Sequence, residues 1–114
     1  MLSRTWITII LIQSSMSFSQ FTQKDYEVIA RNYAELKEAA KKRCAGEQEL
    51  DVVQKAFDFA NEAHKNVRRR SGEPYMLHPI AVAKIVVNDI GLGYKSIAAA
   101  LLHDVVEDTD YTVD

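Results

Sequence analysis

Apolar residues recur at steps of three or four through most of this chain, and this spacing constrains its fold more than any other feature. From Tyr26 to about Cys44 they mark one face of an amphipathic helix. Thr22, with Asp25 three residues later, can cap the first turn, and Gly46 is placed to end the helix. We find no strand pattern, so the spacing predicts an all-α fold.

A second helix is predicted from about Glu47, and the helical spacing then fails. Its inward stripe comprises Leu50, Val53, Phe57, Ala60 and His64. Between Asn66 and His78 the periodicity is lost, and the run 71–74 (Ser-Gly-Glu-Pro) has the chemistry of a turn. We therefore expect an ordered or semi-ordered loop there, and loops of this kind often carry function.

Two more helices are predicted after this loop. Pro79 suits the first position of a third helix, with His78 as its N-cap, and Gly91 closes it. A fourth helix starts near Ser96 and carries the pair His103-Asp104. The buried stripe of the third helix is expected to be Ile80, Ala83, Val87 and Ile90.

The first residues are treated apart from this helical domain. Arg4 precedes an apolar run at 6–12, and serine-rich sequence follows. The outline is that of a signal peptide, but a membrane span needs about 20 apolar residues and this run is far shorter. Export, a misassigned start and a disordered leader remain open for residues 1–21. The domain is assigned to residues 22–114.

Composition excludes several classes of function. With 114 residues, of which 47% are hydrophobic, the chain can form a core as one small domain or as part of a larger one. A net charge of -2 gives no support for general binding to nucleic acid or to an anionic membrane. The single cysteine, Cys44, excludes a disulfide framework and a cysteine-rich zinc site.

The most informative chemical feature is the pair His103-Asp104. An imidazole beside a carboxylate can supply two ligands to one divalent metal, and His78 offers a third. Mixed nitrogen and oxygen donors suit Mn, Fe, Co or Zn without choosing among them. Taken alone, the pair is common by chance at a helix end, and His78 alone is more simply a cap.

Charged residues beside these ligands fit the hydrolysis of a phosphate ester. Glu107 and Asp108, one helical turn after His103-Asp104, could position or deprotonate water, and Arg69 with Arg70 could bind phosphate oxygens. Taken alone, the acidic run would be a solvated helix end. The arginines alone would be an exposed basic turn or a nucleic-acid contact. Their joint appearance in one order favours the enzymatic interpretation.

This order closely resembles the hydrolase domain of the RelA/SpoT homologue family, whose members make and degrade (p)ppGpp. The resemblance covers roughly residues 50–114. The matching stretches are Ala63-His64, 69–79 (RRSGEPYMLHP), Val82-Ala83 and 99–109 (AALLHDVVEDT). It implies an all-helical domain of the HD superfamily. Such a domain holds one Mn²⁺ and, in the stringent response, removes pyrophosphate from the 3′ position of the ribose.

The resemblance also implies roles for individual residues. His78, His103 and Asp104 match the family's metal ligands, and Glu107 with Asp108 match its catalytic acidic pair. Arg69 and Arg70 match a basic pair, usually Arg-Lys, that contacts the nucleotide and its pyrophosphate. His64 also matches a recurrent family position, where we favour packing or hydrogen bonding over ligation.

Two departures from the family pattern stand out. The usual Gly-Gln after the Ala-His motif is Asn66-Val67 here, in rough register. The family's fourth ligand, an aspartate on a later helix, and further nucleotide-contacting residues would lie beyond Asp114. We therefore expect a truncated domain that, in isolation, binds metal weakly and turns over slowly or not at all.

Several functional expectations follow from the resemblance. The substrate is (p)ppGpp, the products are GDP or GTP with pyrophosphate, and the location is the cytoplasm, with export as the minority alternative. The native protein could be bifunctional, with a synthetase domain, or a small hydrolase. Contact with the ribosome would need C-terminal domains, and no membrane or direct nucleic-acid partner is expected. The alternatives are another HD-type nucleotide phosphohydrolase and a non-catalytic domain that binds guanine nucleotide or a partner protein.

Overall fold

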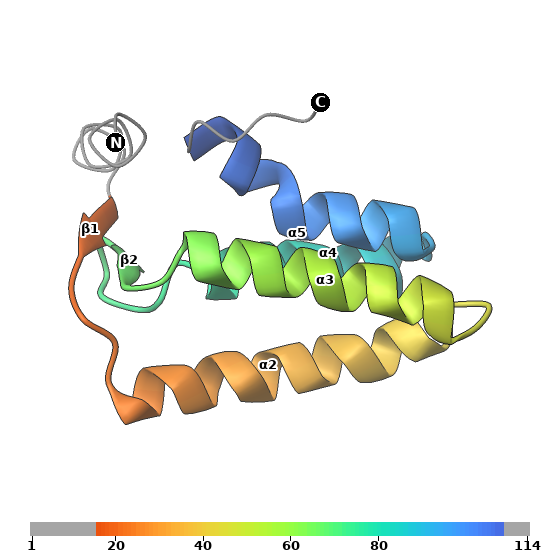
Figure 1. The fold of residues 1–114 in the computed structure, drawn as a ribbon, viewed down its shortest axis with the longest axis horizontal. Helices are drawn as coiled ribbons and strands as arrows, with labels where there is room; N and C mark the ends of the chain where they lie inside the picture. Colours follow the sequence, from red (N-terminus) through yellow and green to blue (C-terminus); the bar gives the residue numbers. More distant parts are fainter. Residues whose placement is uncertain (1–15, 109–114) are drawn as a thin grey trace.

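The computed structural model describes the backbone of residues 16–108 and the side chains of residues 17–105. This part of the chain is dominated by helices, so the predicted helical fold class is confirmed (Figure 1). The helical elements are α2 (Gln23–Lys41), α3 (Glu47–Ala63), α4 (Leu77–Ile85), the π-helical turn η1 (Val86–Ile90) and α5 (Tyr94–Asp108). Two short strands, β1 (Met16–Phe18) and β2 (Val67–Arg69), complete the order.

Helix α2 begins as predicted and ends earlier. The Thr22 N–H donates to Asp25 Oδ2 at 2.8 Å, and the Asp25 N–H donates to Thr22 Oγ1 at 3.3 Å, which completes the capping box. The helix ends at Lys41, three residues before Cys44, and Gly46 serves instead as the residue before α3. Its buried face is Ile29, Tyr33, Leu36 and Ala40.

The core lies between α5 and the pair α3 and α4, with α2 closing the other side (Figure 1). Its fully buried side chains come from every one of these helices and include Leu36, Val53, Ile80, Ile97 and Leu101. Ala98 and Ala100 are buried on α5, and their small side chains let neighbouring helices approach closely. No described helix is both long enough and apolar enough to cross a membrane.

Helix α4 begins two residues before the predicted start at Pro79. The Leu77 N–H donates to Pro74 O at 3.2 Å, and the His78 N–H donates to Tyr75 O at 2.9 Å, so the preceding turn leads directly into the helix. Met76 is therefore the N-cap, and His78 lies in the first turn. Pro79 fits there because the first N–H groups of a helix need no intrahelical acceptor.

The end of this helical stretch widens into the π-helical turn η1. Ile90 is 61% exposed, so its predicted burial is wrong, whereas Val87 is 2% exposed as expected. A π-turn holds more residues than an α-turn, and this rotates Ile90 away from the core face. Gly91 ends the turn at a φ of 79°, and a Cβ there would lie 3.2 Å from the Arg43 guanidinium.

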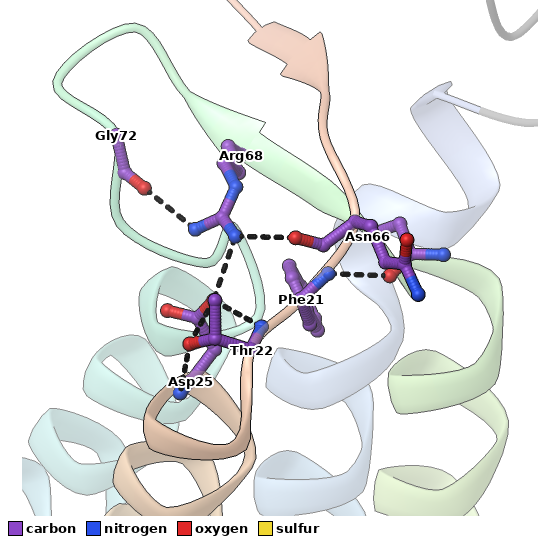
Figure 2. A network of polar contacts seen from close by, with 7 residues as sticks. Phe21, Thr22, Asp25, Asn66, Arg68 and Gly72 are labelled. Atoms are coloured by element: carbon purple, nitrogen blue, oxygen red, sulfur yellow. Dashed lines mark hydrogen bonds and ion pairs between the residues drawn. The ribbon is translucent and has the colours of Figure 1, made fainter.

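Residues 16–21 correct the expectation of a leader or disordered segment over 1–21. β1 pairs with β2 in antiparallel register, with Phe18 opposite Val67, and Phe21 is only 6% exposed. The Phe21 N–H donates to Asn66 Oδ1 at 2.9 Å (Figure 2). The Ser19 N–H donates to Asn66 O at 3.0 Å. Residues 1–15 lie outside the described part of the chain.

Asn66 has an unusual backbone conformation. Its φ is 64°, in the left-handed region that glycine adopts most readily and asparagine tolerates better than most residues. Its side chain also accepts the hydrogen bond from the Phe21 N–H, so asparagine serves this position in two ways.

Candidate metal centre

The structure brings together the three residues that the sequence predicted as ligands. His78 projects from the first turn of α4, whereas His103 and Asp104 project from α5. One potential ligand atom from each residue lies within 4.8 Å of the other two. His103 Nε2 is 3.1 Å from Asp104 Oδ1, and His78 Nε2 is 3.7 Å from Asp104 Oδ2. This convergence was not visible in the helical pattern alone, because it depends on the packing of α4 against α5.

Neighbouring groups orient two of these candidate ligands. His103 Nδ1 lies 2.6 Å from Ala100 O, which can only accept, so Nδ1 donates to it and Nε2 is the nitrogen directed toward the centre. Asp104 is 6% exposed, and its Oδ2 accepts a hydrogen bond from the Tyr75 hydroxyl at 2.9 Å. Such partners fix the ring tautomer and the carboxylate orientation that a metal ion needs.

These donors fit a divalent cation. Two imidazole nitrogens and one carboxylate are a common mixed set for first-row metals, and their atoms already face one region. The set does not select one metal among Mn, Fe, Co and Zn. His78 and His103 remain partly exposed, so the centre can be reached from solvent.

The three consecutive arginines have different environments. Arg68 is 15% exposed at its side chain and donates to Asp25 Oδ2 at 2.6 Å, to Gln20 O and to Gly72 O (Figure 2). Arg68 therefore links β2 and the turn at Gly72 to the start of α2. Arg69 Nη1 lies 3.4 Å from His78 Nδ1, at the rim of the centre, and Arg70 is exposed.

The predicted acidic pair stays a prediction. Glu107 and Asp108 belong to the last turn of α5, but their side chains lie outside the described residues. Tyr75 is the residue whose role sequence reasoning missed. The available signal was its place in the Glu-Pro-Tyr run three residues before His78, combined with an aromatic hydroxyl that needs a partner when buried.

His64 is the C-cap residue of α3 and is buried beside the centre, in agreement with its predicted inward position. It is 2% exposed, its ring centroid is 5.0 Å from that of Tyr75, and its Nδ1 lies 3.1 Å from Ala60 O. Burial lowers the pKa of His64, while the bond to Ala60 and the nearby Asp104 act in the opposite direction. His64 is not among the residues whose ligand atoms converge.

Comparison with known proteins agrees with this arrangement. Residues 56–114, just over half of the chain, match the model of the HD domain family. Two curated relatives illustrate the similarity. The guanosine-3′,5′-bis(diphosphate) 3′-pyrophosphohydrolase of Aquifex aeolicus is 43% identical over 67 residues, which are 59% of this chain and 10% of that protein. The bifunctional (p)ppGpp synthase/hydrolase RelA of Mycobacterium tuberculosis is 44% identical over 63 residues, which are 55% of this chain and 8% of that protein.

The chain therefore matches only about a tenth of each relative's length. The range matched by the HD domain model contains every residue of the candidate centre. A family model that matches more than half of the chain, together with these relatives, establishes the family. The chain belongs to the HD domain family, and its HD domain is of the RelA/SpoT type.

Proposed function

We propose that this chain is the metal-binding part of a (p)ppGpp 3′-pyrophosphohydrolase. The observation that carries the proposal is the convergence of His78, His103 and Asp104, with Arg69 at the rim. A guanidinium at that place suits an anionic phosphate, and the ligands suit a cation. The names of the two relatives supply the nucleotide.

Each group has a defined task in this proposal. A bound divalent cation, which we take to be Mn²⁺ from the family resemblance, would neutralise charge that develops on the phosphate and make bound water more acidic. Arg69 and Arg70 would bind the pyrophosphate oxygens through paired N–H donors. Glu107 and Asp108 would orient the attacking water and accept its proton.

Positioning within the chain supports these tasks. The Tyr75 hydroxyl donates to one oxygen of Asp104, and His103 Nδ1 is bonded to Ala100 O, so both candidate ligands are oriented before a cation arrives. Hydrolysis at the 3′ position would release pyrophosphate and leave GDP or GTP. The substrate is a cytoplasmic nucleotide, and we accordingly propose a cytoplasmic protein.

The test uses the gene product isolated from its own cells. Pyrophosphate release from ppGpp is followed by ion-exchange chromatography with Mn²⁺ and after chelation. We expect release that needs Mn²⁺ and is abolished in Asp104→Asn, because the carboxylate that anchors the cation is lost. Asp51→Asn, which alters an exposed carboxylate on α3, is the matched control and should leave the rate unchanged.

Other results would contradict the proposal. Equal release by Asp104→Asn, or release that persists without metal, would refute a role for the centre in hydrolysis. Faster hydrolysis of GTP or GDP than of ppGpp would favour another HD-type nucleotide phosphohydrolase. Tight guanine nucleotide binding without any hydrolysis would favour a non-catalytic binding domain.

A further inference from the structure

One buried polar atom has no hydrogen-bond partner among the described side chains, and it is Nε2 of His64. His64 is only 2% exposed, so bulk water does not solvate this nitrogen. Buried polar groups in native proteins are rarely left without a partner, and an exception points to a bound water, an ion or a functional role.

The proton on the His64 ring can be located from its neighbour. Nδ1 lies 3.1 Å from Ala60 O, and a carbonyl oxygen can only accept. Nδ1 therefore carries the proton, and burial keeps the ring neutral. Nε2 is left with a bare lone pair, so its missing partner must be a hydrogen-bond donor or a cation.

The surroundings of His64 identify which of these fits. Its ring centroid lies 5.0 Å from that of Tyr75, and the Tyr75 hydroxyl donates to Asp104. The ring centroid of Tyr75 in turn lies 5.7 Å from that of His78. His64 is outside the set of converging ligand atoms, so we take its missing partner to be a hydrogen-bond donor and not the cation itself. A water molecule can donate to Nε2 and also reach toward the centre.

We propose that His64 Nε2 accepts a hydrogen bond from a water molecule held beside the metal centre, which makes His64 a positioning residue for that centre. When the water donates to His64, its oxygen lone pairs are directed away from this ring and are available to the cation. This inference rests on the proposed function only in requiring that His78, His103 and Asp104 bind a metal ion.

Two substitutions separate this role from simple packing. His64→Phe keeps a ring and removes the acceptor, whereas His64→Gln can place an amide oxygen near the same position. We expect His64→Phe to weaken Mn²⁺ binding about tenfold, as loss of an outer-shell partner does, and His64→Gln to recover most of the affinity. Free Mn²⁺ is measured by electron paramagnetic resonance. Water bound to the ion is measured by the enhancement of water-proton relaxation, and this enhancement should be smaller in His64→Phe.

A control and a direct observation complete the test. Tyr33→Phe removes a buried hydroxyl that donates to Gln54 at 3.0 Å, away from the centre, and should leave Mn²⁺ affinity and hydration unchanged. In the unmodified protein, ¹⁵N spectra of its three histidines should show His64 as the Nδ1–H form with a hydrogen-bonded Nε2. This measurement needs no variant to fold.

The outcomes distinguish this inference from the proposed function. If the unmodified protein binds no Mn²⁺, both are overturned. If Asp104→Asn abolishes binding and His64→Phe matches the unmodified protein in affinity and hydration, only the role of His64 is overturned. A ¹⁵N shift typical of a free Nε2 lone pair, or of a nitrogen bound directly to added Zn²⁺, would also overturn it.

Discussion

Asn66 offers a test of how residues 16–21 are joined to β2, which carries Arg69. Its backbone has a φ of 64°, and its side chain accepts from the Phe21 N–H at 2.9 Å. Substitution therefore changes two separable quantities. One is the conformational free energy of the left-handed backbone, and the other is the hydrogen bond to Phe21.

The magnitudes follow from these two terms. Loss of the acceptor should lower the free energy of unfolding by about 1 kcal/mol. An alanine in the left-handed region adds about 1 kcal/mol relative to glycine. We therefore expect Asn66→Ala to destabilise the protein by about 2 kcal/mol and Asn66→Gly by about 1 kcal/mol. Asn66→Asp retains an acceptor and tolerance of this φ, so it should stay close to the unmodified protein.

Urea unfolding followed by circular dichroism gives the free energies, and amide hydrogen exchange locates the effect. Exchange at the Phe21 amide should accelerate in both Asn66→Ala and Asn66→Gly and stay slow in Asn66→Asp. If glycine destabilises as much as alanine, the backbone argument is refuted. If alanine leaves the Phe21 amide protected, the side-chain hydrogen bond is refuted.

Three further predictions concern the centre, the core and acid stability. Tyr75→Phe should weaken Mn²⁺ binding by about 10- to 100-fold in a calorimetric titration, because one oxygen of Asp104 loses its donor, and unchanged affinity would contradict this. Leu36→Ala, at a site with no exposure, should lower the free energy of unfolding in urea by about 2–5 kcal/mol, whereas Leu92→Ala, at a residue 43% exposed, should change it far less. The hydrogen bond from Arg68 lowers the pKa of Asp25 from 3.8 to about 2 in the folded protein. The ionised carboxylate therefore contributes its full stabilisation at pH values above 3.8, the pKa in the unfolded chain, and this contribution is lost as the pH falls through the folded-state pKa. Asp25→Asn should accordingly be less stable than the unmodified protein at neutral pH, and the difference should shrink below pH 3.8 and vanish below about pH 2. A constant difference across this range would exclude the linkage.

Local patterns predicted the parts of this fold whose causes are local. The capping box of Thr22 and Asp25 depends on neighbours within a few residues, and helical spacing alone indicates which residues of α2, and His64, face inward. β1 was missed because it is three residues long and its partner, β2, lies far along the chain. The prediction that Ile90 is buried was wrong because the spacing of apolar residues does not indicate the π-helical turn.

In the candidate centre, too, some features could be predicted from the sequence and others depend on packing. The His103-Asp104 pair is visible in sequence, and His78 was included because of the motif around it. The bond from Tyr75 to Asp104 and the unpartnered nitrogen of His64 depend on how α3, α4 and α5 pack. Orientation of ligands is a property of this long-range packing, so the sequence indicated which residues converge but not what holds them.

The centre joins two helices that are separate along the chain, and this has a thermodynamic consequence. A cation shared by His78 on α4 and by His103 and Asp104 on α5 would act as a cross-link that exists only in the folded state. Under the proposed function, binding and folding would therefore be linked. At a free cation concentration 100 times its dissociation constant, the folded state gains about 2.7 kcal/mol. Melting temperature should then rise with the logarithm of cation concentration, so thermal unfolding can report occupancy without any substrate.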